Sequence, residues 1–432
     1  MAKKKVGSGK KGTQTVPDKG RRQLLYLGLG AVAATGATAA AYKAGWFSSA
    51  PEGGGPATPG LTILRKANYD ESPENAIRAC DEMITHYARG LDNPSALIHA
   101  VRAEGRDFRR ADGSRAVDFL CSKFAADKEV NGKRYVYFLR DAEVHDNSFL
   151  KTFLEANVSL DQPVIVGATR YTLRDVANSA KSLFRADPEN LDPLLVHDHL
   201  PWTLIAFSIL MPPSEPEWTN AYDERINMVP LIDRSLAEFE KTCSLTEEAL
   251  ERGQPEPVQF RETIKKYSCF GLHSVYAFLS CLKHGYRGND LPARLTRMLD
   301  IVSYRLKGDA TALDREYAEE GKGAPPIVVQ ALYLRAIIKL YGHALESINY
   351  VKLHKLIPIT PGEDRRFQEG LDDLNKSIFT LRLLDWDALR RNVNQMLGPG
   401  RGDVFISDII IALGHAARGL KLLTSQNPDT AA

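Results

Sequence analysis

The sequence has few cysteines and none of the short cysteine motifs that mark common metal and redox sites. Only five of the 432 residues are cysteine, namely Cys80, Cys121, Cys243, Cys269 and Cys281. No two of them form a C-x-x-C pair, so neither a zinc ribbon nor a thioredoxin-type site is indicated. Up to two disulfides could form outside the cytoplasm. Because most of these cysteines lie in apolar helical patterns, we interpret them as small buried hydrophobic residues.

An excess of positive charge is also missing from most of the chain. Overall there are 56 basic and 54 acidic side chains, but residues 1–22 hold eight of the basic and one of the acidic residues. The remainder, with 48 basic and 53 acidic side chains, has a net charge of about −5. A slightly acidic domain lacks the basic surface that drives phosphate binding, so we expect no nucleic-acid partner.

A dinucleotide site is excluded by missing context. Gly28-x-Gly30-x-x-Ala33 follows an apolar run, and such a loop needs a strand before it and an acidic residue about 20 positions later. The next acidic residue is Glu52, which lies in a Pro/Gly-rich segment that cannot be a buried strand. We therefore expect no nucleotide, and no other cofactor is indicated.

The same N-terminal region predicts a membrane span. Leu24 to Tyr42 carries no charge, and a spanning helix needs about 20 apolar residues. The basic residues are concentrated before this stretch, which predicts a cytoplasmic N-terminus. Residues 1–22 are then a basic cytoplasmic tail, 23–47 a transmembrane anchor and 48–60 a linker. The main domain would face the periplasm from a bacterial-type inner membrane that the chain crosses once.

A second interpretation of this region is a cleaved export signal. Arg21-Arg22-x-Leu24-Leu25 resembles a twin-arginine signal, and Ala37-x-Ala39 could be its cleavage site. The pair lacks the usual Ser or Thr before it and Lys after it. Trp46 and Phe47 suit a membrane interface better than a cleavage region, so we favour the anchor. After cleavage the protein would instead be soluble in the periplasm.

Helical periodicity dominates from residue 61 onward and predicts one mainly α-helical domain over 61–425. Helix starts are indicated by Ser72-Pro73, by Asn93-Pro94 and by Thr172-x-x-Asp175. A small β element is expected near 133–171, where 133–140 and 162–173 would form a strand pair around an intervening helix. Residues 219–243 and 269–284 are each expected to be helical, Asp403 or Ser407 should start the last helix, and 426–432 should be a disordered tail.

Two stretches suggest an architecture. "CFGLHSVYAFLSCLKHGYRG" (269–288) and "HDHLPWTLIAFSI" (197–209) resemble inner-helix segments of α/α-toroid proteins of the terpenoid-cyclase and prenyltransferase-like type. The resemblance implies a large helical domain, either toroid-like or built of stacked helical hairpins. The aspartate-rich motif of the cyclases and an Asp/Cys/His zinc set are absent, and a fold does not fix an activity.

Candidate catalytic residues are few: His197, Asp198 and His273. Within His197-Asp198-His199 the two histidines point in different directions on a helix, so capping or polar lining is the favoured interpretation. Cys269 and His273 are four residues apart and could bind metal or act as nucleophile and base. This helix face, which also carries His284, offers too few ligands for zinc. We therefore expect a buried core histidine and no metal.

Carboxylates are plentiful, but their spacing does not reveal which of them meet in space. An enzyme built on a toroid would need two near the centre. We expect most to be solvated; they include Glu155, Asp223, Glu224, Asp372, Asp373, Asp385 and Asp387.

Three functions are compatible with these features. Because no compact set of nucleophile, base and oxyanion donors can be recognised, we favour a membrane-anchored scaffold subunit that binds other envelope proteins. The main alternative is an α/α-toroid enzyme, a hydrolase or lyase acting on a polysaccharide or isoprenoid. The third is a carrier or sensor with an apolar cavity.

The difference in positive charge between the two ends of residues 22–47 predicts the membrane topology. A phosphatase reporter that folds only outside the cytoplasm, fused after Thr424, should be active because the positive flank holds the N-terminus inside. Enzyme activity in whole cells measures this. Activity of a cytoplasm-only reporter fused at the same position would contradict the assignment.

Overall fold

The computed structural model describes residues 72–187, 191–193, 195–255, 264, 266–320 and 324–425. Segments 1–22, 23–47, 48–60 and 426–432, for which a tail, a span, a linker and a disordered end are predicted, lie outside these residues. No helix within the described ranges is both long and apolar enough to cross a bilayer.

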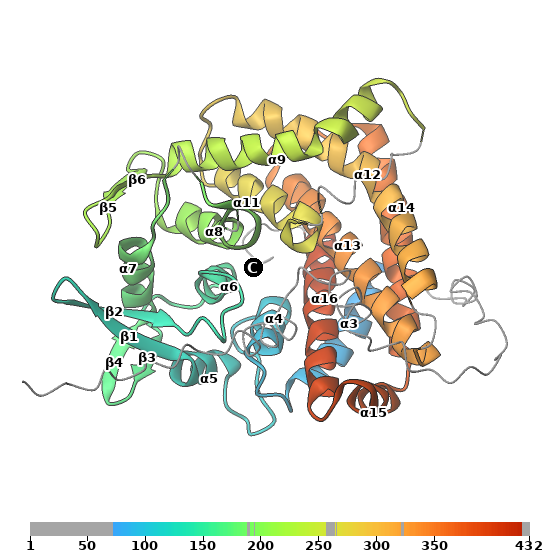
Figure 1. Cartoon of the computed structure of the whole chain (residues 1–432), viewed down its shortest axis with the longest axis horizontal. Coiled ribbons are helices and arrows are strands. Elements are labelled where there is room, and N and C mark those ends of the chain that lie inside the picture. The colour runs from blue at the N-terminus through green and yellow to red at the C-terminus, as the bar shows by residue number, and fades with distance from the viewer. Residues whose placement is uncertain are drawn as a thin grey trace, which may run out of the picture.

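Helices make up most of the described chain, which confirms the mainly α prediction (Figure 1). Their bounds are α3 Pro73–Ala88, α4 Pro94–Glu104, α5 Ala116–Lys123, α6 Ser148–Glu155, α7 Leu173–Leu183, α8 Leu200–Leu210, α9 Met228–Glu251, α11 Leu272–Lys283, α12 Leu291–Glu320, α13 Pro326–His354, α14 Pro361–Arg382, α15 Trp386–Leu397 and α16 Arg401–Thr424.

Local side-chain chemistry explains several helix starts. The Ser72 hydroxyl accepts a hydrogen bond from the Asn75 amide, and Asn93 caps α4 in the same way. Thr172 and Asp175 form a complete capping box. These three predicted starts are confirmed. The prediction for the last helix was wrong: α16 begins at Arg401 after Gly400, whose left-handed conformation turns the chain without a side-chain cap.

Within the described residues the strands form three separate antiparallel hairpins. They are β1 Ala125–Val130 with β2 Lys133–Phe138, β3 Pro163–Val166 with β4 Thr169–Thr172, and β5 Glu217–Thr219 with β6 Arg225–Asn227. Residues 133–140 and 162–173 therefore do not form one strand pair, because each segment pairs within its own hairpin around a tight turn. The prediction of a helix starting at Thr219 was also wrong, since that stretch first forms the third hairpin and α9 starts at Met228.

Six helices form a closed inner ring. Each of α4, α6, α8, α11, α13 and α16 contacts the next in chain order, and α16 returns to contact α4 (Figure 1). Helices α3, α9, α12 and α14 pack on the outside of this ring. Helices α8, α11 and α13 are buried on nearly all sides, as expected for helices that are apolar all round.

Glycines set the closest crossing of this ring. A Cβ on Gly342 in α13 would lie 2.9 Å from the Ala416 backbone nitrogen in α16. A Cβ on Gly419 in α16 would lie 2.9 Å from the Glu346 nitrogen in α13. Because both Cβ atoms are absent, the two helix backbones approach closely. This brings the side chains at 343 and 346 beside those at 415 and 418.

A stability prediction follows from this crossing. Gly342→Ala should destabilise the fold by about 1–3 kcal/mol, because the added methyl group meets backbone that cannot move aside. The matched change Gly362→Ala, where the nearest atom would be 3.9 Å away, should be neutral or stabilising by up to about 1 kcal/mol. Urea unfolding of the two variants measures the difference. Equal stability would contradict the close crossing.

Candidate active site in the buried centre

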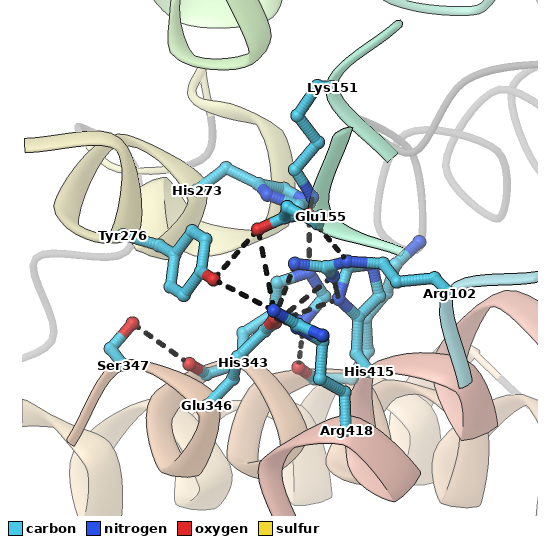
Figure 2. A network of polar contacts seen from close by, with 11 residues as sticks. Arg102, Lys151, Glu155, His273, Tyr276, His343, Glu346, Ser347, His415 and Arg418 are labelled. Carbon is cyan, nitrogen blue, oxygen red and sulfur yellow. Dashed lines mark hydrogen bonds and ion pairs between the residues drawn. The ribbon is translucent and has the colours of Figure 1, made fainter. Parts of the chain in front are cut away.

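Four inner helices place the same short pattern in the centre of the ring. Each has a histidine, then a small residue, then a polar residue three positions after the histidine: His99-Ala-Val-Arg102 in α4, His273-Ser-Val-Tyr276 in α11, His343-Ala-Leu-Glu346 in α13 and His415-Ala-Ala-Arg418 in α16. Residues three apart share one helix face. Both polar groups of each helix therefore point toward the centre, as Figure 2 shows for three of the four helices.

Ion pairs connect these helices across the centre (Figure 2). Arg102 donates to both oxygens of Glu346, at 3.2 Å for Oε2, and its Nε donates to Glu155 of α6 at 3.2 Å. The Arg418 guanidinium lies 3.1 Å from Glu346. Lys151, one turn before Glu155 in α6, contacts Glu155 at 2.7 Å. The two carboxylates thus bind three cations that come from three different helices.

Burial makes these charges interact strongly. The side chains of Arg102, Glu155 and Glu346 are each at most 6% exposed. Burial alone would raise the pKa of Glu155, but Lys151, Arg102 and Arg418 together outweigh it and hold the pKa below its usual range. Burial and Arg102 lower the pKa of Lys151 to about 8. Tyr276 donates its hydroxyl proton to Glu155 at 2.8 Å and completes this part of the network.

The central histidines are held in the neutral form. Burial, reinforced by neighbouring cations, puts the pKa values of His145, His273, His343 and His415 well below 6.5. The rings of His343 and His415 stack at 3.7 Å between centroids, and the Nε2 atoms of His273 and His343 are 3.0 Å apart. A neutral imidazole offers a lone pair that can accept a proton or bind a metal.

His415 has a carboxylate partner and a free nitrogen. Its Nδ1 lies 3.1 Å from Glu346 Oε2 and 2.6 Å from an Arg102 nitrogen. The ring can donate to Glu346, which leaves the lone pair on Nε2, or accept from Arg102, which puts the proton on Nε2. In both cases Nε2 is buried without a hydrogen-bond partner among the described residues. Histidine–carboxylate pairs of this kind orient general bases.

A strained turn brings a thiol to the same place. Cys269 and Phe270 have positive φ angles of 51° and 59°, and Gly271 continues the left-handed conformation at 73°. Because of this turn α11 starts at Leu272, so the prediction of a helix from residue 269 was wrong. The ligand atoms of Cys269, His273 and His343 all lie within 4.8 Å of one another.

The structure separates the three residues proposed from sequence. His273 lies in the centre. The Asp198 carboxylate accepts a hydrogen bond from Ser268, while its backbone carbonyl is 2.6 Å from His145 Nδ1. His197 is half-buried against the Tyr267 ring at 4.3 Å. His197 and Asp198 precede α8 and belong to a π-helical turn, Leu195–His199, outside the ion-pair network.

Several residues of the buried centre were not predicted as site residues from the sequence. Of the seven carboxylates considered, Glu155 is the buried one, and the other six are exposed or half-buried. Arg102, His343, Glu346 and Arg418 were not singled out. The sequence pattern that could have identified them is a pair of polar residues three positions apart within an otherwise apolar helix. This pattern occurs in four helices.

The lowered histidine pKa values predict acid sensitivity. The contribution of these histidines to the free energy of unfolding is fully present above their unfolded pKa of about 6.5. It is lost as the pH falls, because the unfolded chain binds protons that the buried histidines of the folded chain do not bind. His145→Gln should reduce the pH slope of the unfolding free energy between pH 6.5 and 5 by about 1.4 kcal/mol per pH unit. Urea titrations at each pH measure the slope. The exposed control His86→Gln should leave it unchanged, and equal slopes in both variants would refute the neutral state of His145.

All five cysteines are buried and unpaired, as expected for small core residues. Burial raises the pKa of Cys269 to about 11.

Comparison with known proteins adds no assignment: no family model, curated protein or solved structure matches this chain.

Proposed function

We propose that this chain is an enzyme that uses general acid–base catalysis at the buried centre of its helical ring. The observation that carries this proposal is the His415–Glu346 pair with its unpartnered Nε2. A buried nitrogen without a partner is costly to stability, and a catalytic role is one reason for which proteins keep such a group. In this proposal His415 Nε2 is the general base, and Glu346 orients the ring.

The charge balance of the centre indicates the substrate class. Three buried cations, Arg102, Lys151 and Arg418, contact two buried carboxylates, Glu155 and Glu346, and a fourth basic side chain, Lys339, is buried in α13 near His343. Lys339 lies one turn before His343, and no described carboxylate is within ion-pair distance of it. An uncompensated buried cation is unfavourable unless an anion reaches it. The substrate is therefore anionic, and hydrolase or lyase chemistry suits the acid–base pair.

The scaffold hypothesis has weaker support. A docking protein needs a contiguous apolar surface, and the large apolar side chains that are exposed in the described chain lie on separate parts of the fold: Leu139, Leu245, Leu383 and Leu397. A scaffold also has no need of more buried cations than carboxylates in its interior. The closed ring of six inner helices supports a toroid-like class, and the N-terminal charge pattern supports a periplasmic location at the membrane.

This proposal predicts opposite effects for two neighbouring cations of α13. Lys339→Met should stabilise the fold by about 1–3 kcal/mol, because it removes a buried basic group that has no described carboxylate within ion-pair distance. Arg335→Met should destabilise it by about 1–3 kcal/mol, because it leaves the half-buried carboxylate of Asp408 without its ion-pair partner. Urea unfolding measures both. A loss of stability in Lys339→Met would mean that Lys339 is a structural charge and would remove the argument for an anionic substrate.

Ligand binding gives a second readout. A carboxylate-bearing oligosaccharide should raise the melting temperature of the wild type, and its uncharged counterpart of equal length should not. Lys339→Met should lose this shift while remaining folded. Equal shifts with both sugars would contradict recognition of charge.

A further inference from the structure

The geometry points to a zinc site formed by Cys269, His273 and His343, contrary to the expectation from sequence. The sequence offered only the Cys269–His273 pair, and the third ligand comes from α13, 70 residues further along the chain. This inference is independent of the enzyme proposal, because an ion could be bound here whether or not His415 moves a proton.

The ligand types and distances suit zinc. One thiol and two imidazoles are ligands that zinc takes in proteins, and all three residues are at most 4% exposed. With zinc–nitrogen bonds of about 2.0–2.1 Å in a tetrahedron, two nitrogens should be about 3.3 Å apart. The observed Nε2–Nε2 distance is 3.0 Å. Small side-chain rotations would complete the site, and one coordination position would stay open.

The backbone of α13 fixes the binding form of His343. Its Nδ1 is 2.7 Å from the Lys339 carbonyl oxygen, which can only accept a hydrogen bond, so Nδ1 carries the proton. The Nε2 lone pair then points at His273. A histidine whose second nitrogen donates to a backbone carbonyl is a common arrangement around protein zinc.

The strained turn supplies an independent observation. Two successive non-glycine residues in the left-handed region are costly, and such strain concentrates at functional sites. The surrounding structure enforces the turn: the Arg305 guanidinium donates to the Phe270 carbonyl, and a Cβ on Gly271 would lie 2.4 Å from the Phe239 ring. The turn holds Cys269 beside His273 rather than one helical turn away along a regular helix.

The charge of the surroundings decides what fills the open position. Arg102, Lys151 and Lys339 oppose a divalent ion, and the site gains one negative charge when zinc displaces the thiol proton of Cys269 into solvent. The remaining positive charge favours an anion in the fourth position, such as hydroxide formed from a bound water that releases a proton. Three protein ligands with one open position are typical of catalytic zinc.

The test is metal analysis of the full chain, produced without a histidine tag in zinc-supplemented medium. We expect one zinc per chain in the wild type and none in Cys269→Ser or His343→Gln. Cys281→Ser is the matched control, because Cys281 is a buried thiol in α11, the helix that follows the Cys269 turn, and lies outside the cluster. It should retain the metal. Circular dichroism establishes that each variant is folded.

Cobalt replacement tests the site without any substitution. Co²⁺ added to chelator-treated wild type should give the intense thiolate-to-metal absorption band of a tetrahedral site, with one equivalent at saturation. Absence of both stoichiometric zinc and this band would overturn the inference. So would zinc retained in Cys269→Ser. Stoichiometric copper or iron in place of zinc would overturn the choice of ion, and none of these outcomes depends on the stability of Lys339→Met.

Discussion

The interaction on which the rest of the centre depends is the attachment of Arg102 to Glu346 and Glu155. It joins α4, near the start of the described chain, to α13 near its end, and α6 to both. Buried ion pairs contribute little net stability, because desolvation offsets most of the Coulomb attraction. Breaking one is nevertheless expensive, about 3–5 kcal/mol, because the remaining charge is left buried. The pair therefore fixes the register of three helices more than it stabilises them.

Close helix contact and central polarity are consequences of the same residues. The residue after each histidine is Ala or Ser. Because these side chains are small, a neighbouring helix can pack closely beside the polar pair. At the α13–α16 crossing Gly342 and Gly419 let the backbones approach, which brings the His343 and His415 rings to 3.7 Å. Larger residues at these positions would separate the helices and leave the central groups with water or empty space in place of their present partners. The repeated pattern is thus a packing device and a means of gathering ionisable groups.

The sequence predicted what local chemistry determines and missed what only tertiary contact determines. The caps at Ser72, Asn93 and Thr172 are each encoded within four residues, and all three were predicted correctly. The left-handed turn at Cys269 could not be predicted, because it is enforced by Arg305 and Phe239 from other helices. Strand pairing was misjudged because the two-residue turns Asn131-Gly132 and Gly167-Ala168 close each hairpin locally.

The candidate site was partly visible for the same reason. His273 was recognised because Cys269 is near it in sequence, whereas the partners of His343 and Glu346 are 70 and 244 residues away from them in the chain. A polar residue inside such a helix has to be paired, or its burial would be too costly. Four helices with a polar pair at the same spacing therefore imply a common meeting point, even though the sequence does not show which pairs touch.

Three unfavourable features lie close together in the structure: a strained turn at Cys269, a buried lysine, Lys339, with no described carboxylate within ion-pair distance, and an unpartnered nitrogen on His415. Each is separately unfavourable, and simple substitutions could remove each of them. Proteins that fold cooperatively are locally consistent, and the exceptions concentrate where function needs them. Their meeting around His343 is the physical reason to regard this buried centre as the working part of the molecule.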